Sequence, residues 1–316
     1  MPDQEAATTI AASGLTRNFG AHTAVNHINL ELRQGEVLGF LGPNGAGKTT
    51  TMQMLTGNLA PTAGTIRICG IDLLEQPVAA KARIGYLPET PPLYRELSVD
   101  EFLTLAAKLH RIPKARRREA IDDAKQRCGL AGVGGKLIGA LSKGFQQRVG
   151  IAQAIVHAPE VVILDEPTVG LDPNQIREIR ALIRELGGQH SVILSTHILP
   201  EVEAICDRVQ IMHHGNLVYS DTITALRDFQ SGSSILLGLR RPPNPEELAA
   251  VPGVTVVQSV SDTLFRLQFT DGDDRNSIDA LVRRSVDKNW DLYQLSPAQT
   301  SLEEVFVNLT QHEENA

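Results

Sequence analysis

The chain has 316 residues, a length that corresponds to about two domains. Hydrophobic residues make up 42% of the chain and aromatic residues only 4%, so it can bury sizeable cores, which aliphatic side chains must fill. The formal net charge of −7 argues against a protein whose main partner is a nucleic-acid backbone, because phosphate-backbone binding requires a basic surface.

The cysteines, the N-terminal segment and the lengths of the apolar runs indicate the cellular compartment in which the chain works. Cys69, Cys128 and Cys206 are too far apart for a disulfide framework or a zinc-ligand spacing, so we expect three packing residues in a reducing cytosol. The segment 1–14 is acidic and lacks a basic region followed by an apolar one, so no secretory signal is expected. Because no apolar run approaches the roughly 18 residues of a membrane span, other subunits would have to cross any membrane involved.

The first elements predict an edge sheet that leads into a parallel sheet. Ile28, Leu30 and Leu32 alternate with polar residues, which predicts a half-exposed strand, and a more continuously apolar strand follows. A helix is expected from Lys48 to about Leu59, after which the chain turns into another short strand.

Between that apolar strand and the Lys48 helix, residues 42–49 read GPNGAGKT and fit the pattern G-x-x-x-x-G-K-[ST] at every fixed position. The glycines let backbone N–H groups surround a phosphate, Lys48 reaches the outer phosphates, and the Thr49 hydroxyl can bind Mg²⁺. The flanking strand and helix disfavour a chance glycine-rich turn. The predicted phosphate loop comprises Gly42, Pro43, Asn44, Gly45, Ala46, Gly47, Lys48, Thr49 and Thr50.

The middle of the chain predicts a helical insert. A helix is expected from Val99 to about Gly129, with a basic run at 114–118 that is more typical of a solvated face than of a lipid contact. The preceding stretch 87–102 is stiffened by prolines, yet Tyr94 and its neighbours are too apolar for a plain solvent loop. It is therefore a candidate docking surface for a partner helix.

Two apolar runs return the chain to a parallel sheet and end in polar residues. The run 161–164 ends in Asp165 and Glu166 at the carboxyl edge, where ligands of such sheets bind. Asp165 would hold Mg²⁺, and Glu166 could deprotonate the attacking water. His197 closes the next apolar run at the same edge, so we expect it to contact the γ-phosphate. In isolation these residues would favour inert strand ends, but the upstream phosphate loop reverses that preference.

The segment 141–148, LSKGFQQR, starts another helix, which stops by Pro159. Ser142 is a good N-cap and Gly144 permits close backbone approach. The helix N-terminus offers N–H groups and a positive dipole end with no phosphate in its own chain. By physical chemistry alone, an ordinary capped helix explains the segment equally well.

The segments GPNGAGKT, LSKGFQQR, VVILDEP, GLD and STH together resemble an ABC-type ATPase in order and spacing, over residues 14 to about 226. The resemblance implies an α/β fold: a P-loop, RecA-like core with an edge antiparallel sheet, and an inserted helical subdomain at about 90–158, all within a nucleotide-binding domain 1–228. It implies ATP and Mg²⁺ as ligands and a head-to-tail homodimer. The implied additional contacts are Phe19 on adenine, the signature residues Ser142, Lys143, Gly144 and Gln146 on the partner's ATP, and Asp172 at the subunit contact.

Two departures narrow the resemblance. The signature has Lys143 and Phe145 where many relatives have glycine and glutamine, and Glu89, a candidate Mg²⁺ ligand, replaces the usual glutamine. Both differences resemble those of the ABC-2 exporter branch, and so does the ending SLEEVFVNLT. The whole chain resembles ATPases of the gliding-motility and copper-enzyme-maturation type. This implies ATP hydrolysis that powers export or membrane remodelling through separate permease subunits, on the cytoplasmic face of the inner (plasma) membrane, with no nucleic-acid partner.

Beyond about Asp228 the pattern changes to a small α+β domain, 229–316. It contributes none of the ATPase motifs, so we expect an accessory or regulatory role in the dimer. The expected strands are 234–239, 254–260, 264–269 and 291–295, and the expected helices are 245–251, 277–287 and 301–309.

The alternative function is a soluble ABC ATPase that acts on nucleic acid or the ribosome. Too few residues separate Lys48 from Leu141 for a long coiled coil, there is one ATPase unit, and zinc-ligand cysteines are lacking. A P-loop GTPase or small-molecule kinase would leave 141–148 and His197 without a role. Cell fractionation distinguishes the transporter subunit from the ATPase that acts on nucleic acid or the ribosome. Retention with the membrane favours the transporter, and association with ribosomes or nucleoid favours the alternative.

Overall fold

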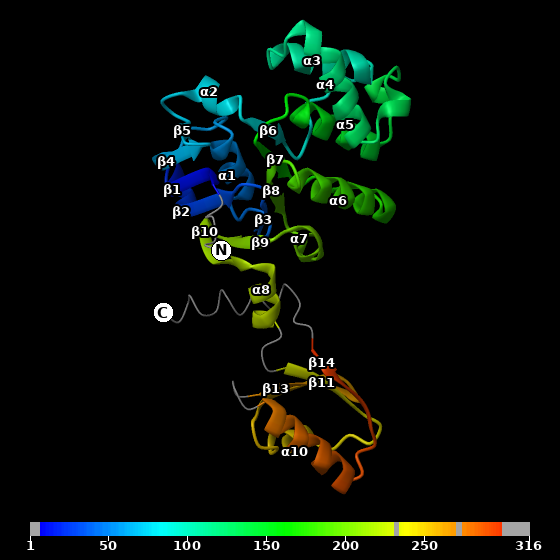
Figure 1. Ribbon diagram of the computed structural model, residues 1–316. Helices are drawn as coiled ribbons and strands as arrows, with labels where there is room; N and C mark the ends of the chain where they lie inside the picture. Colours follow the sequence, from blue (N-terminus) through cyan, green and yellow to red (C-terminus); the bar gives the residue numbers. More distant parts are fainter. Residues whose placement is uncertain (1–6, 231–233, 270–273, 299–316) are drawn as a thin grey trace, which may run out of the picture. The chain divides into compact units, whose positions relative to one another are not determined.

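The computed structural model describes residues 7–230, 234–269 and 274–298 (Figure 1). The chain divides into two compact units, Met1–Ile223 and Thr224–Ala316. Across the described ranges, no helix is both long and apolar enough to cross a membrane.

A six-stranded sheet forms the centre of the first unit, in the order β10-β9-β3-β8-β7-β6. All neighbouring pairs are parallel except β10 with β9. Every residue of β3, β7 and β8 is buried, as the uninterrupted apolar runs predict for parallel strands covered on both faces. The strands are β3 (Val37–Leu41), β6 (Ile84–Leu87), β7 (Val161–Asp165), β8 (Ser191–Thr196), β9 (Arg208–His213) and β10 (Asn216–Thr222).

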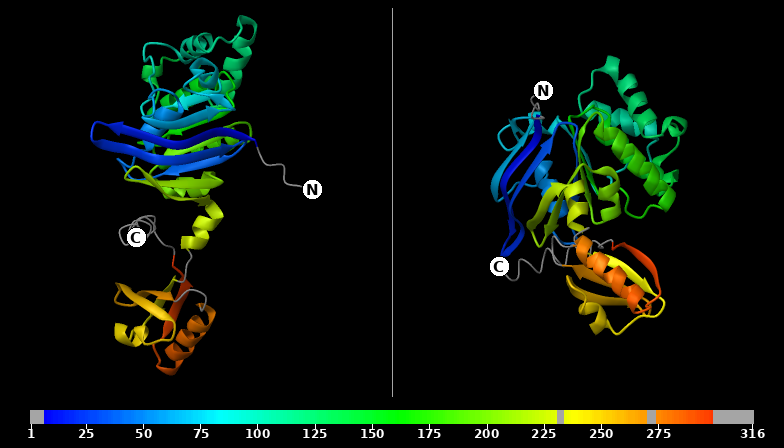
Figure 2. Two further views of the ribbon diagram at one scale, coloured as in Figure 1. Left: turned by 90° about the vertical axis from the view of Figure 1, so that its left-hand side faces the viewer. Right: turned by 60° about the horizontal axis from the view of Figure 1, so that its bottom comes forward.

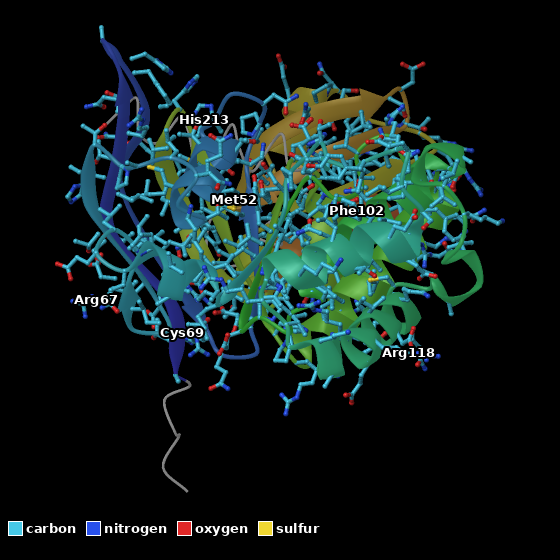
Figure 3. All side chains as sticks on the ribbon, turned by 90° about the horizontal axis from the view of Figure 1, so that it is seen from above. Met52, Arg67, Cys69, Phe102, Arg118 and His213 are labelled. Carbon is cyan, nitrogen blue, oxygen red and sulfur yellow. The ribbon has the colours of Figure 1, made fainter. Side chains whose placement is uncertain are left out.

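An antiparallel sheet in the order β2-β1-β4-β5 covers the helix that follows the phosphate loop. This helix, α1 (Lys48–Leu55), places Met52 and Met54 in one hydrophobic core with residues of both sheets. Figure 3 shows Met52 inside the unit and Arg67 at the outer margin of the edge sheet. The helix is shorter than expected because Gly57 takes a left-handed φ of 67° just beyond it. The edge strands are β1 (Thr8–Phe19), β2 (His22–Arg33), β4 (Ala63–Ile68) and β5 (Ile71–Asp72).

Three helices, α3 (Val99–Leu109), α4 (Lys114–Arg127) and α5 (Lys143–Ile155), form the helical cluster in Figure 1. The single helix expected over 99–129 is two helices, because Arg111 adopts a left-handed φ of 59° and Pro113 caps the second one. A capping box formed by Ser98 and Glu101 starts α3. The other helices of this unit are α2 (Pro77–Lys81), α6 (Pro173–Gly187) and α7 (Leu199–Ile205).

The second unit is a small α+β structure, as expected from its strand and helix pattern. Helix α8 (Ile223–Gln230) spans the division between the units, and an antiparallel sheet follows in the order β12-β13-β11-β14. Figure 2 shows α10 against this sheet, and Leu281 of α10 shares a core with Leu237, Phe265 and Trp290. The helix expected over 301–309 lies outside the described residues. The elements are β11 (Ser234–Leu239), α9 (Pro245–Ala249), β12 (Val254–Ser261), β13 (Leu264–Phe269), α10 (Asp274–Asp287) and β14 (Leu292–Pro297).

Candidate nucleotide-binding site

The phosphate loop connects β3 to α1, and two of its glycines have no room for a side chain. Gly47 precedes α1 with a φ of 107°, and a Cβ atom there would lie 2.4 Å from the carbonyl oxygen of Ala24. A Cβ atom at Gly42 would lie 2.4 Å from the carbonyl oxygen of Met212. The loop is therefore clamped between β2 and β9, which leaves its N–H groups around the start of a helix, where anions bind.

Replacing Gly47 with alanine is expected to cost more stability than replacing Gly45 with alanine. Both glycines have positive φ, so each change carries about 1–2 kcal/mol of left-handed strain. Of these two glycines, only Gly47 adds a collision with backbone, since no atom of the described residues lies within 4 Å of a Cβ atom at Gly45. Thermal unfolding of the two variants without nucleotide measures the difference. Equal melting temperatures would show that the close approach at Gly47 is not energetically important.

Two acidic residues at the end of β7 face different surroundings. Asp165 is fully buried, and its Oδ1 accepts a hydrogen bond from the Ser195 hydroxyl at 2.7 Å. Burial raises the pKa of Asp165 even though hydrogen bonds from Ser195 and Thr49 act in the opposite direction. Among the described residues its Oδ2 has no hydrogen-bond partner. A cation beside this oxygen would offset the cost of burying an ionised carboxylate.

Glu166 leaves the strand in a left-handed conformation, with a φ of 49°, and its N–H donates to the carbonyl oxygen of Ser195 at 2.8 Å. Its carboxylate accepts from Nδ1 of His197, which lies 3.0 Å from Oε1 and 2.9 Å from Oε2. Nζ of Lys48 lies 3.4 Å from the same Oε1 and donates to the carbonyl oxygens of Gly42 and Pro43. The structure thus brings together the three residues that the sequence singles out for catalysis, Glu166, His197 and Lys48.

These residues open onto a hollow of about 590 Å³. Sequence reasoning anticipated most of its lining but missed His22, Ala24 and Val169. The two-residue turn between Phe19 and His22 could have revealed His22, because such a turn places its flanking residues opposite each other. The lining consists of Phe19, His22, Ala24, Asn44, Gly45, Gly47, Lys48, Thr49, Thr50, Glu89, Glu166, Val169 and His197.

The signature residues lie outside this hollow. Ser142 caps α5, and Gly144 packs so tightly that a Cβ atom would lie 2.6 Å from the Gln175 side chain. Gln146 donates its amide to the carbonyl oxygens of Ile138 and Leu141, which holds the loop before the helix. Lys143 and Gln146 line a separate hollow of about 500 Å³ that also includes Glu89.

Asp172, at the end of the GLD segment, also lies outside the hollow. It caps α6 by accepting from the N–H groups of Asn174 and Gln175 at 2.9 and 3.0 Å. Of the residues predicted to act on a partner's ATP, Ser142, Lys143 and Asp172 are exposed, Gln146 is half-buried and Gly144 is buried. None of them lines the hollow beside the chain's own phosphate loop.

Comparisons with known proteins agree with this geometry. A family model described as ABC transporter matches residues 25–169, and one described as an AAA domain matches residues 137–202. The bacitracin transport ATP-binding protein BcrA of Bacillus licheniformis is 43% identical over 213 residues, which cover 67% of this chain and 69% of that protein. The daunorubicin resistance ATP-binding protein DrrA3 of Streptomyces coeruleorubidus is 33% identical over 308 residues, 96% of each chain.

The fold comparison gives the same family. A solved structure of the ATP binding subunit of an ABC transporter has 31% sequence identity and a TM-score of 0.64, and the match covers 70% of this chain and 93% of that chain. The expected α/β fold with its P-loop ATPase core is confirmed. The chain belongs to the ATP-binding subunits of ABC transporters, which hydrolyse ATP and work with transmembrane permease components.

Proposed function

We propose that this chain is the ATPase of an ABC-2 type exporter and that Glu166 activates the attacking water. The observation that carries the proposal is the grouping of Glu166, His197 and Lys48 in one hollow next to the phosphate loop. Glu166 is held by His197 and is in reach of water, whereas Lys48 and the loop N–H groups bind the phosphates. The relatives named for bacitracin transport and daunorubicin resistance support export as the direction.

The residues beside the phosphate loop fit a magnesium ion. Mg²⁺ is usually bound by one or two carboxylates together with substrate phosphates, and here the Thr49 hydroxyl lies beside the buried Asp165, whose Oδ2 needs a partner. Glu89, on the lining of the same hollow, is the third candidate ligand. Bound Mg²⁺ would neutralise charge on the transferred phosphoryl group.

Changing Asp165 to asparagine is expected to raise the Mg²⁺ concentration needed for half-maximal ATP hydrolysis. The amide keeps the shape and can still accept from Ser195, but it removes the negative charge that holds the cation. Asp207→Asn is the matched control, because the Asp207 carboxylate accepts from the N–H of Val37 and does not line the nucleotide hollow. Titration of ATPase activity with Mg²⁺ tests this. An unchanged Mg²⁺ requirement in Asp165→Asn would contradict the assignment.

Phe19 is the proposed adenine contact. Its ring lines the hollow and is 47% exposed, and the Arg17 guanidinium lies 4.6 Å from the ring centroid. The Arg17 guanidinium thus makes a cation–π contact with the Phe19 ring, and the exposed part of the ring remains accessible to a base. Weaker binding of ATP, with unchanged binding of inorganic triphosphate, is the expected result for Phe19→Ala. Equal losses for both ligands would count against an adenine contact.

A second copy of the chain would complete the site. The N–H groups at the start of α5, together with Ser142 and Gly144, lie outside the hollow of this chain's own phosphate loop. Lys143 and Gln146 flank these groups. In a head-to-tail homodimer they would close on the γ-phosphate bound to the partner's loop, with Asp172 at the contact. No nucleic acid takes part in this proposal.

The permease subunits would hold the ATPase at the cytoplasmic face of the plasma membrane and dock beside residues 87–102. Tyr94 in this stretch is 51% exposed and packs edge-on against Phe102 of α3, with ring centroids 6.1 Å apart. Purification of the native complex from membranes, followed by identification of its subunits, tests the exporter assignment. Recovery with ribosomes or nucleoid instead would support the nucleic-acid alternative.

The second unit is proposed to stabilise or regulate the dimer. Its own core, formed by β11, β13 and α10, involves none of the nucleotide-site residues. A chain ending at Asp228 should therefore still bind ATP while its self-association or its coupling to the permease changes. A folded truncated chain that cannot bind ATP would refute the independence of residues 1–228.

A further inference from the structure

A fully buried carboxylate lies behind the proposed catalytic residues. Glu201, in the first turn of α7, has no exposed surface. Its Oε2 accepts hydrogen bonds from the Thr168 hydroxyl at 2.9 Å and the Thr196 hydroxyl at 3.2 Å. Both threonines are also buried. Since a buried carboxylate is costly without partners, this pair of donors constrains both of the segments that carry them.

The two threonines belong to the segments that carry the proposed catalytic pair. Thr168 comes two residues after Glu166, and Thr196 directly precedes His197. The Thr196 hydroxyl also accepts from the N–H of Ile198 at 3.2 Å, so hydrogen bonds hold the chain on both sides of His197. One carboxylate therefore connects the end of β7 to the end of β8, at the point where Glu166 and His197 meet.

The second oxygen of Glu201 faces α6. Nη2 of Arg180 lies 3.5 Å from Oε1, which gives the buried charge a cationic neighbour. In addition, the carbonyl oxygen of Thr168 accepts from the N–H of Leu171 at 3.2 Å. The carboxylate is thus connected through Thr168 to the turn that leads to Asp172.

We propose that Glu201 is a positioning residue for ATP hydrolysis: it holds the Glu166 and His197 segments in register, so that Nδ1–H of His197 keeps its hydrogen bond to the carboxylate of Glu166. This inference rests on the proposed function, in which Glu166 activates water. Glu201 does not line the nucleotide hollow and acts only through Thr168 and Thr196. In the proposed dimer it also connects the Asp172 turn, which meets the second copy, to the catalytic pair.

A purely structural role predicts a different result, and the chain offers a matched control. Glu36 is another buried carboxylate with an arginine partner: its Oε1 accepts from Arg208 at 2.9 Å and its Oε2 from the N–H of Arg33 at 2.8 Å. None of these groups belongs to the catalytic segments. If Glu201 only stabilises the fold, Glu201→Gln and Glu36→Gln should affect melting temperature and activity alike.

The experiment compares ATPase kinetics and thermal unfolding of the full-length protein with Glu201→Gln, Glu36→Gln, Thr168→Val and Thr196→Val. We expect Glu201→Gln to lower kcat by between about tenfold and a hundredfold, because a displacement of about 1 Å at a catalytic group has an effect of that size. KM for ATP should stay unchanged, since Glu201 does not line the nucleotide hollow and its hydrogen bonds go to Thr168, Thr196 and Arg180. Glu36→Gln should keep the wild-type kcat.

Two further measurements separate the possible explanations. If Glu201 acts through Thr196, adding Thr196→Val to Glu201→Gln should lower kcat no further, whereas independent roles give additive losses. The threonine variants, which remove only a hydroxyl, carry the test if Glu201→Gln does not fold. A wild-type kcat in Glu201→Gln, or a loss no larger than in Glu36→Gln, would overturn the inference. Glu166→Gln in the same assay distinguishes failure of this inference from failure of the proposed function. Full turnover by Glu166→Gln would refute the proposed role of Glu166 in activating water, whatever the result for Glu201→Gln.

Discussion

Replacement of Glu166 by glutamine is expected to lower ATP turnover by about 10²–10⁴-fold, the usual contribution of a general base. An amide cannot accept the proton of the attacking water. It can still accept from Nδ1–H of His197, so the geometry of the site should survive. The change also removes the carboxylate that lies 3.4 Å from Lys48, which leaves that ammonium group to the phosphates. ATP binding should therefore persist, and the ATP-bound dimer should accumulate.

Glu160→Gln is the matched control for this variant. Glu160 precedes β7 at its opposite end and pairs with Arg83 at the surface, so the same chemical change there should leave turnover unaltered. Single-turnover hydrolysis and size measurement with ATP give the two readouts. Near-normal hydrolysis by Glu166→Gln would show that another group activates the water.

The contiguous motifs could be predicted from the sequence because local chain geometry determines them. Residues 42–49 need positive φ at two glycines and a helix that begins at Lys48, and both are present. Asp165 and His197 follow apolar strands, so the parallel sheet brings them to one edge. The strands β11 and β13 and the helix α10 could likewise be predicted from the spacing of apolar residues and from the turn residues between them.

Other features depend on contacts between distant segments. The left-handed φ of Glu166 has no signature in the run of apolar residues before it. Glu201 is an acidic residue in an ordinary helix start, and only the fold shows that its carboxylate is buried between Thr168 and Thr196. The break between α3 and α4 is different, because Pro113, which caps α4, marks it in the sequence, whereas the left-handed φ of Arg111 has no signature there. For Glu166 and Glu201, the contacts that determine the conformation or the burial come from distant segments.

The central claim is a site shared between two copies of the chain, and paired defects can isolate it. Lys48→Ala removes the ammonium group from the phosphate loop, and Ser142→Arg places a large side chain at the start of α5, where Ser142 is exposed. Each variant alone should hydrolyse almost no ATP. A dimer that contains one of each would hold one site with both defects and one with neither.

The most direct measurement is therefore the ATPase activity of purified mixed dimers of Lys48→Ala and Ser142→Arg chains. Dimers of Lys48→Ala with the double variant Lys48→Ala/Ser142→Arg serve as the control, since neither of their sites has an intact phosphate loop. The account predicts that hydrolysis reappears in the first mixture and stays absent in the second. Verified mixed dimers without recovered activity would contradict a site built from both chains.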